Sequence, residues 1–116
     1  MILRVWRARI DPARIDEYRR FERERCMPML RKQPCFLGVL FLRQAEDHAL
    51  SLTVWEDVGA VDALESSPSY REVTHALAES ALLAGGESVV VFEVEGGALR
   101  PEALVRALDR LGNAGY

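Results

Sequence analysis

The sequence predicts one α+β domain in the order strand, helix, strand, strand, helix, strand, followed by a short C-terminal helix. The length of 116 residues suits a single domain. Residues 36–42, Phe-Leu-Gly-Val-Leu-Phe-Leu, form an apolar run that is too short for a helix and lacks the alternation of a strand with one wet face. Both faces of this strand should therefore be buried. Apolar residues recur three and four positions apart in residues 11–32 and 57–81, which predicts two helices.

The first strand covers residues 2–10 and leads directly into the first helix. Asp11 is a suitable helix cap, and Pro12 fits the first helical position, where its missing N–H is not needed. Pro28 lies inside the helical pattern and predicts a kink or a broken last turn. Acids and arginines are interleaved over residues 19–25, which indicates a solvated helix face with local ion pairs.

The second half of the domain repeats this order after a hairpin. A polar turn over residues 44–48 joins the apolar run to a third strand, residues 49–56. Asp57 then caps the second helix, which is interrupted by Ser-Ser-Pro at residues 66–68 and continues to about residue 81. Gly-Gly at 85–86 should stop it, and residues 88–94 form a last strand that is apolar on both faces.

This order is that of a ferredoxin-like βαββαβ fold, in which both helices cover one face of a four-stranded antiparallel sheet. Nothing before residue 94 is left to cover the other face. The second and fourth strands are nevertheless apolar on both sides. A second copy of the same sheet is the simplest cover, so we expect a homodimer through the sheet faces.

The predicted domain covers residues 1–96, and residues 97–116 form a C-terminal tail. Residues 101–111 predict a short helix with one leucine stripe, and Gly112 is its stop. A helix of this length is not stable alone, so it should dock on its own domain or on a partner.

Composition excludes several classes of function. The net charge of −3 gives no general reason to bind nucleic acid. The sequence contains no leader and no apolar segment near membrane-spanning length, so we expect a cytoplasmic protein without membrane contact. Cys26 and Cys35 lack the spacing of a zinc site, and the acids are dispersed, so we expect free thiols and no bound metal.

Three stretches together resemble the antibiotic biosynthesis monooxygenase family. They are residues 11–18, which follow the first strand, residues 31–38, and residues 54–57, which lead into a helix containing Ser-Pro-Ser-Tyr at 67–70. The resemblance covers about residues 2–94 and implies a dimeric α+β barrel. The family contains cofactor-independent monooxygenases, haem-degrading enzymes and proteins of unknown role.

The chain departs from this family at several positions. Members often have Gly where Cys35 stands, and many carry histidines where Ala63 and Ser69 stand. Both departures argue against a quinol-monooxygenase-like activity. In the haem-degrading branch, a strand Asn and a helix Trp align with Trp6 and Leu64 of this chain. The haem-binding His of that branch aligns with Thr74 or His75.

Four residues are candidates for ligand binding. Arg4 and Trp6 share one face of the first strand, and on the helix side they would border a cleft where Trp6 stacks on a ring and Arg4 holds an anion. The alternative is a core tryptophan beside an arginine whose stem reaches solvent. Trp55 and Tyr70 line the same cleft or serve in core or interface packing.

His75 is a weaker candidate, because helical spacing sets it opposite Val73 and Leu77. No Ser/His/Asp or Cys/His arrangement is suggested, so no catalytic residue is assigned.

These residues lead to one expected function with two alternatives. The first is a cofactor-independent monooxygenase that acts on or binds a small aromatic or quinone-like molecule in a cleft between sheet and helices. Its pocket needs to exclude water and stabilise an anion. One alternative is a haem-binding or haem-degrading enzyme. The other is a non-catalytic homodimer that binds a small ligand or is purely structural.

Overall fold

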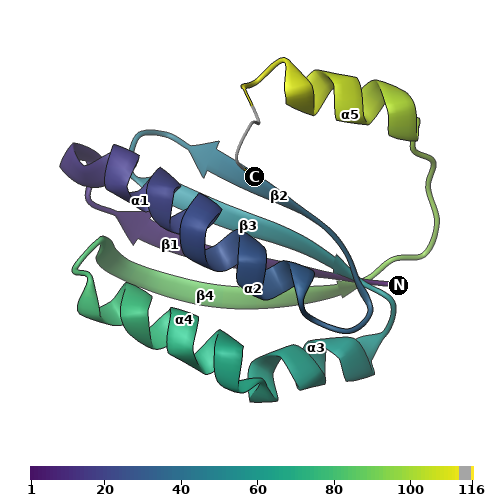
Figure 1. Cartoon of the computed structure of the whole chain (residues 1–116). Coiled ribbons are helices and arrows are strands. Elements are labelled where there is room, and N and C mark those ends of the chain that lie inside the picture. Colours follow the sequence, from purple (N-terminus) through teal and green to yellow (C-terminus); the bar gives the residue numbers. More distant parts are fainter. Residues whose placement is uncertain (113–115) are drawn as a thin grey trace.

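The computed structural model describes residues 1–112 and 116 of the chain and has the predicted ferredoxin-like architecture. One antiparallel sheet of four strands, in the order β2-β3-β1-β4, carries the helices α1 to α4 on one face (Figure 1). The elements are β1 Ile2–Ile10, η1 Pro12–Arg14, α1 Ile15–Phe21, η2 Glu22–Cys26, α2 Met27–Arg31, β2 Phe36–Gln44, β3 His48–Trp55, α3 Val58–Ser66, α4 Pro68–Glu79, β4 Leu83–Glu93 and α5 Pro101–Asp109.

The first helix is interrupted before Pro28. Asp11 caps its start by accepting a hydrogen bond from the backbone N–H of Ala13 at 3.0 Å. Residues Glu22–Cys26 then form a π-helical turn, in which the Met27 N–H donates to the Glu22 carbonyl five residues back. Pro28 has no N–H to continue the regular pattern, so the break expected there takes the form of this turn.

The second helix ends earlier than predicted. It splits at Ser67, as the Ser-Ser-Pro segment indicated, but α4 stops at Glu79 and β4 begins at Leu83. Ala81 adopts a positive φ of 59°, which ends the helix before the two glycines are reached. Gly85 and Gly86 lie within β4, where the pairing with β1 shifts register.

The core lies between the sheet and the helices. Trp55, Ile10 and Leu64 are its largest fully buried side chains. Two clusters fill this layer, one around Trp55 and Leu64 and one around Ile10 and Tyr18. The side chains on the even-numbered positions of β1 therefore point toward the helices.

The opposite face of the sheet is apolar and uncovered by α1 to α4 (Figure 1). Leu40, Leu52, Val5 and Val90 form one row across it, because each is the register partner of the next. Val90 and Phe92 of β4, which lie on this side, are each 49% exposed in the single chain. We call this surface the open face. It has the apolar character that the sequence predicted for a surface covered by a second copy.

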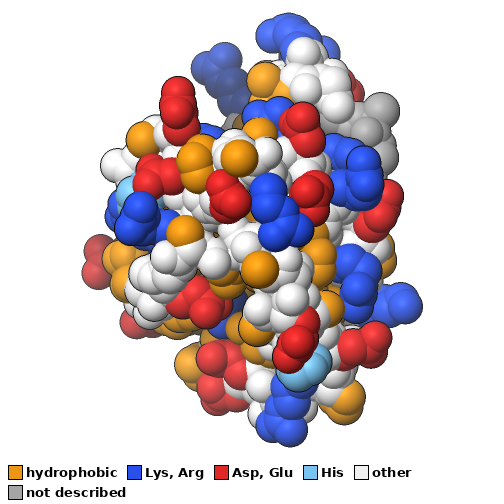
Figure 2. Space-filling model, turned by 90° about the vertical axis from the view of Figure 1, so that its left-hand side faces the viewer, with side chains coloured by type: hydrophobic (Ala, Val, Ile, Leu, Met, Phe, Trp, Pro, Cys, Tyr) orange, Lys and Arg blue, Asp and Glu red, His pale blue; other side chains and the backbone are white. Residues whose placement is uncertain are grey.

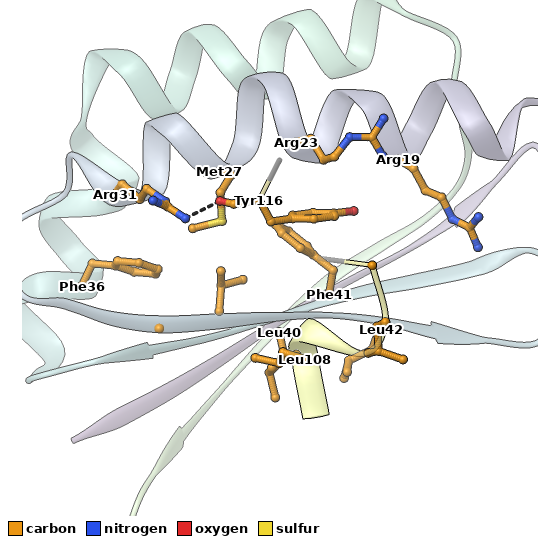
Figure 3. A pocket seen from close by; sticks show the side chains of 14 residues that line it. Arg19, Arg23, Met27, Arg31, Phe36, Leu40, Phe41, Leu42, Leu108 and Tyr116 are labelled. Carbon is orange, nitrogen blue, oxygen red and sulfur yellow. Dashed lines mark hydrogen bonds between the residues drawn. The ribbon is translucent and has the colours of Figure 1, made fainter. Parts of the chain in front are cut away.

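Helix α5 lies beside the edge of the open face. Leu108 is half-buried and lies on the same side of β2 as Leu40 and Leu42 (Figure 3). The other apolar residues of this region, Leu104, Val105 and Leu111, remain exposed. The helix that the sequence required to dock thus leaves most of its apolar stripe uncovered in one chain.

Surface charge is mixed where Figure 2 views the molecule. Acidic and basic side chains alternate over this end, with apolar side chains scattered between them. None of the described helices is long and apolar enough to cross a membrane.

Candidate functional site

A small cavity lies between the sheet and the helix layer, where the sequence predicted a cleft. Its volume is about 70 Å³. Arg4 and Trp6 of β1, Thr53 of β3 and Tyr70 of α4 line it. The remaining lining comes from Tyr18, Cys26, Met29, Leu30, Phe41, Ser51, Leu64, Val73, Thr74, Leu77 and Glu87. We call this cavity the cleft.

Arg4 is the cationic group among the residues that line the cleft and is only 5% exposed. Its Nη2 donates a hydrogen bond to the Tyr70 hydroxyl at 2.9 Å, and its guanidinium lies 5.5 Å from the Tyr70 ring centroid. Glu65 approaches the same nitrogen at 3.9 Å from a half-exposed position. The buried Arg4 Nε has no hydrogen-bond partner among the described residues. An unpaired buried donor is costly, so this N–H offers a place for an acceptor oxygen.

Trp6 forms the side of the cleft next to β4. It packs against the cluster around Tyr18 and Leu77, and its Nε1 donates to Glu87 Oε1 at 3.3 Å. Glu87 belongs to an exposed edge strand. The Trp6 ring therefore packs against the helix layer, and its N–H is hydrogen-bonded to the exposed edge strand.

Trp55 supports the cleft from behind and does not line it. It is fully buried, and its Nε1 donates to Thr53 Oγ1 at 2.8 Å. Thr53 Oγ1 in turn donates to the Arg4 carbonyl at 3.2 Å. These bonds fix the β1–β3 pair beneath Arg4. The structure thus brings Arg4, Trp6 and Tyr70 together and leaves Trp55 in the core, and a direct contact of Trp55 with a ligand stays a prediction.

His75 lies away from the cleft. Its side chain is 76% exposed on α4 and stands 3.7 Å from Glu79, in the i, i+4 relation. Thr74, its neighbour in sequence, lines the cleft instead. The described residues contain no group of three His, Cys, Asp or Glu side chains placed to hold a metal ion.

Both cysteines are poor nucleophiles in this structure. Burial raises the pKa of Cys26 to about 12. A hydrogen bond with Glu56 is the main cause that raises the pKa of the exposed Cys35. Each thiol therefore stays protonated near neutral pH, and the thiolate is the reactive form.

Two partners of the cleft residues escaped the sequence analysis. Glu65 and Glu87 partner Arg4 and Trp6, but both stand far from them in the chain. One signal pointed to such partners, because an arginine on the apolar face of a strand needs an acceptor. Only the strand register and the placement of α3 identify which acids supply it.

The size of the cleft restricts what it holds as it stands. A cavity of about 150 Å³ accommodates benzene. The cleft has less than that volume, so an aromatic ligand has to displace side chains to enter. The Trp6–Glu87 bond at strand β4 is an exposed part of the wall.

Comparison with known proteins agrees with this fold. The family model for antibiotic biosynthesis monooxygenases matches residues 1–76. The chain belongs to the antibiotic biosynthesis monooxygenase family. No protein with a curated description matches the chain.

Solved structures show the same fold. A monooxygenase from the gene ActVA-Orf6 of Streptomyces coelicolor, in complex with Nanaomycin D, is 20% identical with a TM-score of 0.73, over 85% of this chain and 91% of that one. SnoaB, a cofactor-independent oxygenase from Streptomyces nogalater, is 19% identical with a TM-score of 0.64, over 85% and 97%. Rv0793 from Mycobacterium tuberculosis is 17% identical with a TM-score of 0.68, over 84% and 98%.

Proposed function

We propose that this chain is a cofactor-independent monooxygenase that oxidises a small aromatic or quinone-like molecule held in the cleft. The observation that carries the proposal is the buried Arg4 guanidinium, whose Nε has no partner among the described residues. Family membership supports the reaction class. Two structural neighbours support the choice of substrate and the lack of a cofactor, since one is described with Nanaomycin D and the other as cofactor-independent.

The reaction draws its electrons from the substrate. A deprotonated phenol or hydroquinone-type ring is electron-rich enough to reduce molecular oxygen. When a ring CH₂ becomes C=O, one oxygen atom enters the substrate and the other leaves as water. The substrate supplies all four electrons, so the balance needs no further reductant. The protein then has to hold the anion, orient the ring and exclude water.

The cleft residues suit these tasks. Arg4 Nε donates to the substrate oxyanion, and the low exposure of the guanidinium strengthens that bond. Tyr70 accepts from Arg4 Nη2 and so keeps its own O–H free to donate a second hydrogen bond. Trp6 provides a flat apolar surface for the ring.

A binding role without turnover is the second candidate. The small volume of the cleft favours it, because a cavity of about 70 Å³ leaves little room beside a ring for oxygen and a moving proton. The same Arg4 and Trp6 contacts would then bind an acidic aromatic ligand.

We propose further that the protein acts as a homodimer joined through the open face. The row of Leu40, Leu52, Val5 and Val90 and the 49% exposure of Val90 and Phe92 support this arrangement. An apolar surface of this extent is typical of a covered interface.

Oxygen uptake tests the proposed reaction. Purified protein is mixed with a panel of hydroxylated anthrones and naphthohydroquinones, and oxygen consumption is followed with an electrode. We expect Arg4→Ala to lower kcat/KM tenfold or more, because a hydrogen bond to a charged group is worth about 1.5–3 kcal/mol. Arg9→Ala is the matched control, since Arg9 lies on the same strand with its side chain 54% exposed.

The outcomes separate the two candidates. If oxygen consumption with every compound is no faster in the presence of the protein than in buffer alone, the monooxygenase proposal is contradicted. If calorimetry then finds binding that Arg4→Ala weakens and Arg9→Ala does not, the binding role stands. If neither variant alters binding, the cleft is not the ligand site.

A further inference from the structure

A second and larger hollow surrounds the outer edge of β2. Its volume is about 800 Å³ (Figure 3). It is lined by Arg19, Arg23, Met27, Arg31, Phe36, Gly38, Val39, Leu40, Phe41, Leu42, Leu108, Leu111, Gly112 and Tyr116. We call it the groove. Its basic side chains come from the first helix, and its apolar floor comes from β2.

Tyr116 is held in the groove by each of its parts. Its ring lies 5.4 Å from the Phe41 ring, and the Arg23 guanidinium lies 5.9 Å from the ring centroid. Its hydroxyl donates a hydrogen bond to Glu22 Oε1 at 3.2 Å. Its main-chain carbonyl accepts a hydrogen bond from Arg31 Nη2 (Figure 3). Ring, hydroxyl and carbonyl therefore have three different kinds of partner.

Glu22, which accepts the hydrogen bond from the Tyr116 hydroxyl, is not among the residues that line the groove and is unusual in its burial. It is only 3% exposed, although it stands in a run of charges that predicts a solvated face. It begins the π-helical turn, and such turns alter the direction in which side chains leave a helix. The Tyr116 hydroxyl gives the one side-chain hydrogen bond that the described residues supply to this carboxylate. The other titratable or charged groups around Glu22 are Tyr18, Arg19, Arg23, Cys26 and Arg43.

We propose that the place at the wall of the groove that Tyr116 fills is a recognition site for a phenol that carries a carbonyl group nearby, and that Tyr116 of the same chain is its resident occupant. The acceptor at Glu22 selects a hydroxylated ring over a plain one, because a phenyl group leaves the buried carboxylate without its donor. Arg31 selects the carbonyl, and Phe41 selects the flat ring.

Ligand competition tests this assignment in the full chain. The probe is N-acetyl-L-tyrosinamide, with N-acetyl-L-phenylalaninamide as the matched control. We expect Tyr116→Ala to bind the tyrosine probe at least tenfold more tightly than the phenylalanine control. We also expect wild type to bind the probe at least tenfold more weakly than Tyr116→Ala, since the tethered phenol competes at high effective concentration. Arg31→Ala added to Tyr116→Ala should weaken binding of the tyrosine probe, whereas Lys32→Ala added to the same variant should not.

The side-chain carboxyl of Glu22 gives a second readout by NMR. The Tyr116 hydrogen bond lowers the pKa of this carboxyl, so Tyr116→Phe should raise it. The tyrosine probe should restore the original titration in Tyr116→Ala. Equal binding of both probes, no binding by Tyr116→Ala at millimolar concentration, or an unmoved titration overturns the proposal. A wild-type titration that changes with protein concentration overturns the assignment of Tyr116 to its own chain.

Discussion

Arg4 and Tyr70 join the sheet to the helix layer through one hydrogen bond of 2.9 Å. The donor comes from the central strand β1 and the acceptor from the first turn of α4. Ser67 caps this helix by accepting the Tyr70 N–H at 3.5 Å, which sets the start of the helix against the cleft. The position of the guanidinium thus depends on a helix cap as well as on the strand that carries it.

Removing the Tyr70 hydroxyl should destabilise the fold. Tyr70→Phe leaves a second donor of the buried Arg4 unpaired, and an unsatisfied buried polar group costs about 1–3 kcal/mol. Urea unfolding measures the loss. Glu65→Gln is the comparison, because its contact with Arg4 is longer and half-exposed and should cost less. A larger loss in Glu65→Gln than in Tyr70→Phe would contradict this account of the site.

Glu22 should make stability depend on pH. Burial raises its pKa from 4.5 to about 7, so between these values the native state binds more protons than the unfolded chain. Stability from this group is therefore greatest below pH 4.5 and is lost as the pH rises to 7. Glu22→Gln removes the titration, and wild type should lose about 2 kcal/mol more than this variant between pH 5 and 8. If the unfolding free energies of wild type and Glu22→Gln change with pH in parallel, the Glu22 carboxyl has an unshifted pKa and this prediction is wrong.

A charge on the open face should prevent pairing of two copies. Leu52 stands in the middle row between Leu40 and Val5, so Leu52→Glu sets a carboxylate at the centre of the expected interface. Sedimentation should give twice the chain mass for wild type and one chain mass for the variant. Val58→Glu, at an exposed site on α3, should leave the mass unchanged. A monomeric wild type at micromolar concentration would rule out this interface.

Cys35 offers a stabilising change. Its φ of 63° lies in the left-handed region, which costs an L-residue about 1–2 kcal/mol. Glycine adopts this conformation freely, although its greater entropy in the unfolded chain offsets part of the gain. Cys35→Gly should raise the unfolding free energy by up to about 1 kcal/mol. Cys35→Ser keeps the strain and should not. Equal stability of the two variants would exclude the backbone as the cause.

Local signals in the sequence predicted most of the fold. The first strand was predicted with the bounds that the structure has, and Asp57 caps α3 by accepting the Ala60 N–H at 2.8 Å, as expected. The sequence predicted that α4 ends further along the chain than it does. Alanine has a high helix propensity, but Ala81 adopts a positive φ in the structure. The groove was not predicted at all. Glu22 sits among exposed charges in sequence, and only the π-helical turn buries it.

The sheet has two outer edges, and the structure treats them differently. Leu108 and Tyr116 flank β2 from its two sides, whereas β4 runs exposed along its whole length (Figures 1 and 3). A strand with free N–H and C=O groups can template the addition of another chain, and unlimited growth needs such a strand at both ends of the sheet. Obstruction of one end would stop the edge-to-edge addition of copies after a single step. The tail beside β2 thus leaves β4 as the edge that is open to such addition.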